Sequence, residues 1–211
     1  MSTEVRSTET QEAIILRRRR RKARALLAGG LVLGVGGAVV LAAWTDDEFV
    51  TGLFSAGQFN LEGSVDGSTY ADHDTAGSAA TLSFSLPVDE LAPEETVYAG
   101  FWVRLAAGTT NPADLSLVGL MGTGTAVAEL DYAIYPLAAG ATCGAATATG
   151  TPLAAGSLDD TAVTSTSVSL SAPVAPAAGV AQQLCFAVTS SAGLEQGTSA
   201  TGVWQFTAAS S

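Results

Sequence analysis

The stretch VYAGFWVRL, residues 97–105, decides the fold class, because its apolar residues recur at every second position. Val97, Ala99, Phe101, Val103 and Leu105 fall on one side of an extended chain, and the intervening residues fall on the other. This alternation is the pattern of a strand with one buried face. The stretch therefore predicts a half-buried β-strand.

The same period of two recurs along the chain after residue 43. The stretch ATLSFSL, residues 80–86, repeats it with Leu82, Phe84 and Leu86. Apolar residues with helical spacing are missing there, and clusters of Gly, Pro, Asp, Ser and Thr separate the apolar runs. We predict eight strands, at residues 53–62, 80–86, 97–105, 114–120, 127–135, 162–170, 182–189 and 201–208.

Many short strands joined by turn-rich connections favour an all-β fold. We predict a two-sheet antiparallel β-sandwich with a jelly-roll-like topology, in which each sheet buries one face against the other. The stretch 137–160, LAAGATCGAATATGTPLAAGSLDD, offers almost no bulky side chain and is predicted to be a long loop or a weak edge strand. A chain of 211 residues with 47% hydrophobic composition supports one such domain.

Charge divides the chain into a basic beginning and an acidic remainder. Eight of the nine basic residues lie before residue 25, and only Arg104 follows. Residues 1–42 carry eight basic and three acidic side chains, a net charge of +5, whereas residues 43–211 carry one basic and 17 acidic side chains, a net charge of −16. Nucleic-acid binding needs basic side chains to neutralise phosphates, so the acidic remainder excludes nucleic acid as its partner.

The beginning of the chain has the layout of a secretory signal. RRRRRKAR, residues 17–24, precedes ALLAGGLVLGVGGAVVLAA, residues 25–43, which has no charge over 19 positions. A basic stretch followed by an apolar stretch and small residues is typical of a signal peptide. We predict a signal peptide at residues 1–42 and a β-sandwich domain at residues 43–211, with Val40 and Ala42 at positions −3 and −1 of a cleavage site before Ala43.

A retained membrane anchor is the alternative to cleavage. The apolar run approaches the roughly 20 residues that a membrane-spanning helix needs, and its basic end would stay in the cytoplasm. Twin-arginine export fits less well, because the usual apolar residues just after the paired arginines are missing. With cleavage, the chain is secreted or displayed at the bacterial cell surface, and it meets a membrane only through the signal segment.

The junction between signal and first strand carries a family resemblance. AAWTDDEFVTGLFSAGQFNLEGS, residues 42–64, resembles the start of the TasA and camelysin family, which is exported through the SipW signal peptidase. In that family a small residue, an aromatic, a polar residue and Asp end the signal, and FxSGxx(D/N)L opens the first strand. The residues that match are Ala43, Trp44, Thr45, Asp46, Phe54, Ala56, Gly57, Asn60 and Leu61.

The resemblance implies a jelly-roll surface protein, in some members the subunit of extracellular biofilm fibres. GVWQFTAAS, residues 202–210, is similar to the closing aromatic strand of the family, and Pro93 falls on a turn position of the family. Glu94 follows that proline where the family has Gly. The match with family motifs covers about thirty residues at the signal junction, and the rest is a likeness of architecture.

Camelysin is described as a surface metalloprotease, so an enzyme of that type is an alternative. A zinc protease needs about three protein ligands and a general base, typically within HExxH. This chain has one histidine, His73, between Asp72 and Asp74. Serine catalysis would depend on that same histidine. We therefore predict no enzyme, no catalytic residue and no cofactor, and interpret YADHDTAG as a turn, with a divalent cation near Asp72, His73 and Asp74 left open.

Three classes of function remain: a structural fibre or matrix subunit, a non-catalytic surface-binding module and a camelysin-type hydrolase. The sequence favours the first, with self-association or related matrix subunits as partners besides the signal peptidase. After cleavage, AWTDDEFVTGLF would begin at a free end with no proline to interrupt a strand ladder. We predict that it is donated to a neighbouring subunit through Trp44, Phe49, Val50, Leu53 and Phe54. Folding back on its own domain as an edge strand is the alternative.

The two cysteines of the chain, Cys143 and Cys185, are predicted to form one disulfide, because an exported domain meets an oxidising compartment. Cys185 has the opposite parity to Leu184, Phe186 and Val188. It should therefore lie off their face of the strand and tie the weak stretch around residue 143 to that strand.

Overall fold

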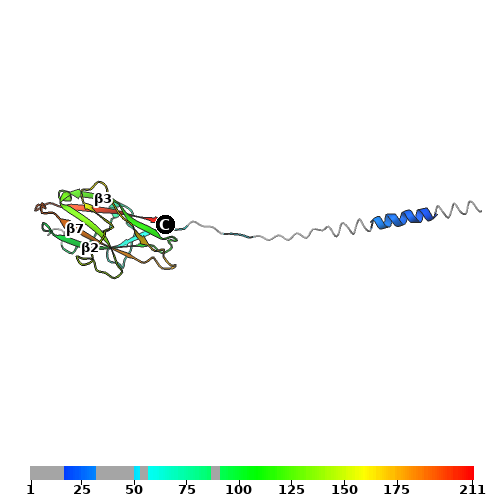
Figure 1. The fold of residues 1–211 in the computed structure, drawn as a ribbon, viewed down its shortest axis with the longest axis horizontal. Helices are drawn as coiled ribbons and strands as arrows, with labels where there is room; N and C mark the ends of the chain where they lie inside the picture. Colours follow the sequence, from blue (N-terminus) through cyan, green and yellow to red (C-terminus); the bar gives the residue numbers. More distant parts are fainter. Residues whose placement is uncertain (1–16, 32–49, 53–56, 87–90) are drawn as a thin grey trace, which may run out of the picture. The chain divides into compact units, whose positions relative to one another are not determined.

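The computed structural model describes residues 17–31, 50–52, 57–86 and 91–211. The chain divides into two compact units, Met1–Phe54 and Ser55–Ser211 (Figure 1). In the first unit, residues 17–31 form a helix whose side chains are all exposed. Among the described residues, no helix combines the length and the apolar character needed to cross a membrane.

In the part that the structure describes, the second unit contains eight strands and two single 3-10 turns. The turns are η1 (Ala76–Ser78) and η2 (Val127–Glu129). The strands are β1 (Leu61–Ser64), β2 (Thr96–Leu105), β3 (Ala113–Gly124), β4 (Leu130–Leu137), β5 (Ala154–Ser157), β6 (Val168–Leu170), β7 (Gln182–Ser190) and β8 (Ala200–Ser210).

The strands form two antiparallel sheets, so the predicted two-sheet sandwich is confirmed. The larger sheet has the order β1-β2-β7-β4-β5, and the smaller has the order β6-β3-β8. A jelly roll distributes eight strands over two sheets. This order keeps the jelly-roll neighbours β2-β7-β4-β5 and β6-β3-β8, but β1 pairs with the outer edge of β2 instead of joining β8. The two sheets therefore have five and three strands instead of four each.

The core lies between the sheets and follows from the alternation in the sequence. In β2, Val97, Ala99, Val103 and Leu105 are buried, and Phe101 packs against the core. β7 lies beside β2 with Phe186 opposite Ala99, and Phe186 is 2% exposed. The inward residues of the two sheets interdigitate, which is how a sandwich removes apolar surface from water.

The predicted strands differ from the observed ones at several places; in the predicted strand 127–135, for example, residues 127–129 form η2 and the strand β4 begins only at Leu130. Residues 80–86 are not a strand; they make one backbone hydrogen bond, from Ser85 N–H to the Tyr98 carbonyl, while Leu82 and Phe84 pack against the core. The alternating apolar residues of this segment are partly buried, but its backbone does not form the hydrogen-bond ladder of a strand. The predicted strand 162–170 shortens to β6, and the described part of 53–62 forms a strand only from Leu61. The weak stretch 137–160 contains both a loop and the edge strand β5.

Gly122 provides a test of how closely the two sheets approach. A β-carbon at this position would collide with the backbone carbonyl of Leu158. We therefore expect Gly122→Ala to lower the free energy of unfolding by about 1–3 kcal/mol, since overpacking forces the backbone apart. Gly77→Ala is the matched control, because a β-carbon there meets no atom within 4 Å. Urea denaturation of both variants checks this, and equal stabilities would contradict the close approach.

Candidate functional site

The candidate site is the outer edge of β8. This strand spans 11 residues, and it pairs along its length with β3. Among the strands that the structure describes, none pairs with the other side of β8. A strand at the edge of a sheet presents unpaired N–H and C=O groups that can accept another strand. We call this side of β8 the open edge.

The inner face of β8 is incompletely covered. Trp204 and Phe206 face the core, and their ring centroids lie 5.1 and 6.1 Å from that of Phe186. Neither aromatic side chain reaches full burial, nor does any other residue of β8. In β7, directly comparable inward residues such as Leu184 and Phe186 are buried. The sandwich is therefore less well closed along β8 than along β7.

Two buried polar atoms lie close to this poorly closed side. Trp204 Nε1 and Tyr132 Oη have no hydrogen-bond partner among the described residues. The two rings meet edge to face with centroids 5.9 Å apart. Burial raises the pKa of the Tyr132 hydroxyl, with a smaller contribution from Asp160. A buried polar group without a partner costs free energy, so these two groups reduce the stability of this part of the core.

The open edge also lacks the devices that usually protect an edge strand. Natural edges carry charged residues or proline, or they are short. The sequence of β8, ATGVWQFTAAS, contains neither a charged residue nor proline. By contrast, β1 and β5 have four residues each and β6 has three, so the other edges are short. β8 is the long and unprotected edge of the described domain.

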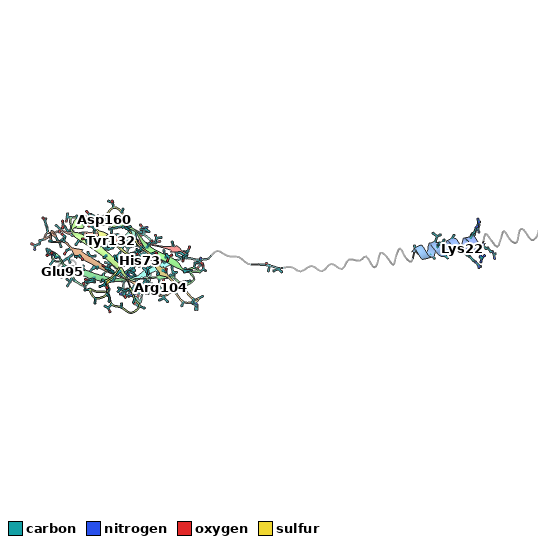
Figure 2. The ribbon with its side chains drawn as sticks, viewed as in Figure 1. Lys22, His73, Glu95, Arg104, Tyr132 and Asp160 are labelled. Carbon is teal, nitrogen blue, oxygen red and sulfur yellow. A yellow bond between two sulfur atoms is a disulfide. The ribbon has the colours of Figure 1, made fainter. Side chains whose placement is uncertain are left out.

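The edge strand β1 is in addition held to β2 by an ion pair. Arg104 Nη2 on β2 lies 3.0 Å from Oε2 of Glu62 on β1. The guanidinium carbon lies 3.7 Å from the centroid of the Tyr70 ring, an arrangement that favours a cation–π contact (Figure 2 labels Arg104). The single basic side chain after residue 24 is thus held by its own domain.

The structure contains the predicted disulfide. Cys143 and Cys185 are joined across a sequence separation of 42 residues. Cys185 is fully buried and lies on the face of β7 opposite to Leu184 and Phe186, as its parity predicts. The bond fixes the connection between β4 and β5 onto the outer face of the larger sheet.

Most residues of the predicted cleavage site and donor segment lie outside the described residues. These are Val40, Ala42, Ala43, Trp44, Phe49, Leu53 and Phe54. Val50 is described, and its side chain is 91% exposed. The signal segment, its cleavage and strand donation therefore stay predictions.

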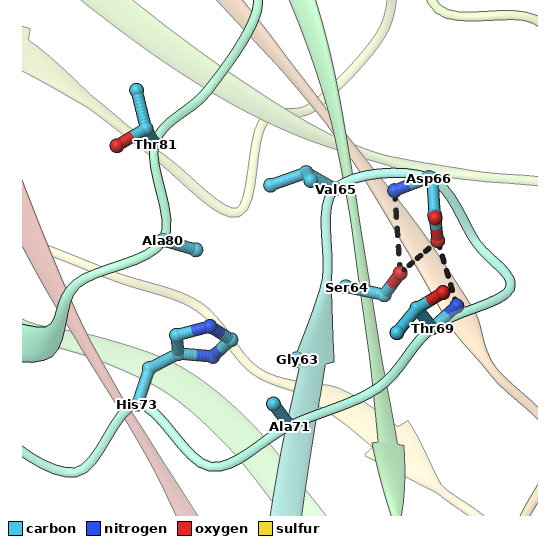
Figure 3. A pocket seen from close by; sticks show the side chains of 9 residues that line it. All are labelled: Gly63, Ser64, Val65, Asp66, Thr69, Ala71, His73, Ala80 and Thr81. Carbon is cyan, nitrogen blue, oxygen red and sulfur yellow. Dashed lines mark hydrogen bonds between the residues drawn. The ribbon is translucent and has the colours of Figure 1, made fainter.

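The stretch around His73 borders a pocket of about 480 Å³ formed by β1 and the β1–β2 connection (Figure 3). His73 meets the edge of the Phe101 ring with centroids 6.5 Å apart, and Asp72 accepts a hydrogen bond of 2.9 Å from the side chain of Asn60. No group of three or more His, Cys, Asp or Glu side chains that could hold a metal ion occurs among the described residues.

Asp66 organises the turn beside this pocket. Its carboxylate accepts hydrogen bonds from the backbone N–H of Thr69 at 2.7 Å and from the Ser64 hydroxyl at 2.8 Å (Figure 3). A further hydrogen bond of 2.7 Å comes from the backbone N–H of Ser68. These hydrogen bonds, that from Thr69 first, hold the pKa of Asp66 well below its usual range. The carboxylate therefore stabilises the turn that forms one wall of the pocket.

The open edge was not predicted as a site. The sequence predicts a strand at residues 201–208, but it does not tell which strands lie at an edge. The absence of charge over residues 200–211 is the signal that could have singled it out. A scan against protein-family models finds no match for this chain, and no curated protein matches it either.

Proposed function

We propose that this protein is an exported cell-surface structural protein, a subunit of extracellular fibres or of a biofilm matrix, assembled by β-strand donation. Residues 43–54 of one subunit pair with the open edge of β8 in the next. The observation that supports this most is the long uncharged edge of β8 over an incompletely covered aromatic face.

The donor and the edge are matched in length. The donor segment has 12 residues and β8 has 11. Main-chain hydrogen bonds would supply affinity, and the aromatic and aliphatic side chains of the donor would cover Trp204 and Phe206. A donor on one surface and an acceptor on another give a head-to-tail contact, which does not close and so produces filaments.

The net charge of residues 43–211 predicts that assembly depends on salt. At −16, subunits repel one another at low ionic strength, and the Debye length falls from about 30 Å at 0.01 M to about 10 Å at 0.1 M. Assembly should therefore be promoted by salt, and it is best tested at high ionic strength.

The first test removes the donor. We expect the exported protein to scatter light and show filaments in negative stain at high salt, and a variant that lacks residues 43–51 to stay monomeric. Strand donation by this segment is wrong if both proteins stay monomeric or if both form the same filaments.

The second test blocks the acceptor. Ala208 faces inward on β8 and is half-buried, whereas the neighbouring Ala209 is exposed on the other face. We expect Ala208→Lys to abolish filaments, because an inward-pointing charge prevents strand addition. Ala209→Lys changes the net charge equally and should assemble like the unchanged protein. Filaments of equal length and number from the two variants would exclude the open edge as the acceptor.

A further inference from the structure

Six carboxylates of the sandwich gather at one of its two ends. The connections at residues 91–95, 125–129, 158–160 and 191–199 meet at this end, as hydrogen bonds from Ser190 N–H to the Glu95 carbonyl and from Ser191 N–H to the Glu129 carbonyl show. We call it the acidic end. Its connections carry six carboxylates and no basic side chain: Glu94, Glu95, Glu129, Asp159, Asp160 and Glu195. Figure 2 labels Glu95 and Asp160 at this end.

The opposite end, which we call the neutral end, is formed by residues 57–60, 106–112 and 171–181. Hydrogen bonds hold these connections together: Thr110 N–H donates to the Gln58 carbonyl at 3.1 Å, and Gly179 N–H donates to the Leu105 carbonyl at 2.8 Å. The three connections contain no charged side chain of their own, and two carboxylates border them: Asp72, which accepts a hydrogen bond from the Asn60 side chain, and Asp114 near the start of β3. In a domain with 16 more acidic than basic residues after residue 42, such a surface stands out.

The neutral end also exposes apolar side chains. Val174 and Val180 in the β6–β7 connection are 82% and 76% exposed, and Phe59 is 43% exposed. Phe59 precedes Asn60, whose carbonyl accepts a hydrogen bond from Ala106 N–H, and Val180 follows Gly179 at the same end of β2. Exposed apolar groups in connections that carry no charged side chain are typical of a protein–protein contact.

We propose that the neutral end is a docking surface for a second copy of this chain. Like charges oppose a contact between two acidic ends, each with six carboxylates, whereas a contact through the neutral end brings fewer carboxylates together and meets less repulsion. A contact between the neutral end of one copy and the acidic end of the next orients subunits head to tail.

The position of the donor segment in the chain also favours a second copy as the partner of the neutral end. This step rests on the proposed function. Only residues 55–57 separate Phe54, the last residue of the donor segment, from Gln58 at the neutral end. Four extended residues span at most about 14 Å. A copy that accepts the donor must therefore lie against the neutral end of the copy that supplies it.

The test compares two double variants of the exported protein that add the same charge. Val174→Glu/Val180→Glu places two carboxylates on the neutral end, and Val118→Glu/Met121→Glu places two on β3, where the side chains are 49% and 52% exposed. Desolvating an unpaired carboxylate in a contact is costly. We expect the first variant to associate at least about tenfold more weakly in sedimentation velocity at high salt, and the second to match the unchanged protein.

Melting temperatures of both variants verify folding, since all four positions are exposed. Equal association of the two variants, whether both weakened or both unchanged, overturns the neutral end as the docking surface. If the protein without residues 43–51 still associates and the Val174→Glu/Val180→Glu variant does not, strand donation is wrong and the neutral end stands. An unchanged protein that stays monomeric at high salt overturns both.

Discussion

Replacing Phe186 by Ala is expected to lower the free energy of unfolding by about 3–5 kcal/mol, the range found for large-to-small changes of buried aromatic residues. Phe186 lies in the central strand β7, is 2% exposed and meets Trp204 and Phe206 of the opposite sheet edge to face. Its removal opens a cavity between the sheets at their main aromatic contact. Guanidinium denaturation followed by tryptophan fluorescence measures the change.

Phe59→Ala is the matched control, because it removes the same side chain at a position that is 43% exposed. It should cost less than about 1 kcal/mol, since surface truncations leave no cavity. Similar losses at the two positions would contradict the assignment of Phe186 to the centre of the core.

Removing the disulfide is expected to lower the free energy of unfolding by about 3–4 kcal/mol. The bond closes a loop of 42 residues, and the chain-entropy relation gives roughly that value for the unfolded state. The Cys143→Ala/Cys185→Ala variant and the unchanged protein in excess reductant should then denature at the same, lower denaturant concentration.

Thiol labelling of the oxidised protein under denaturing conditions is the accompanying control. It should find no free thiol, because both cysteines are paired. Two equivalents of thiol in the native exported protein, or a reductant that leaves stability unchanged, would show that this bond does not stabilise the domain.

The strands with the strongest alternation were predicted best. The predictions for β2 and β7 are correct to within one residue, because bulky inward residues such as Val97 and Phe186 leave one register that buries them. The parity of Cys185 followed from the same rule. Residues 80–86 alternate equally well but form no strand, since alternation specifies which side chains are buried and not whether the backbone finds a partner.

The candidate site was less accessible to prediction. The donor segment is visible in the sequence as a stretch that carries five aromatic and aliphatic residues and no proline, and it lies largely outside the described residues. The acceptor could not be predicted, because Trp204 and Phe206 have the same pattern whether β8 is central or at an edge. Only the neighbours of β8 distinguish the two cases.

The all-β class, the faces of the main strands and the side of β7 on which Cys185 lies follow from the amino-acid sequence. These features depend on residues one or two positions apart, whose side chains are placed by the local geometry of an extended chain. The tertiary structure alone decided that β1 pairs with β2, that β8 has an open edge, and that carboxylates from four separate connections gather at one end. Each of these depends on contacts between segments far apart in the chain. Such contacts form only when the apolar faces of both sheets are buried against each other.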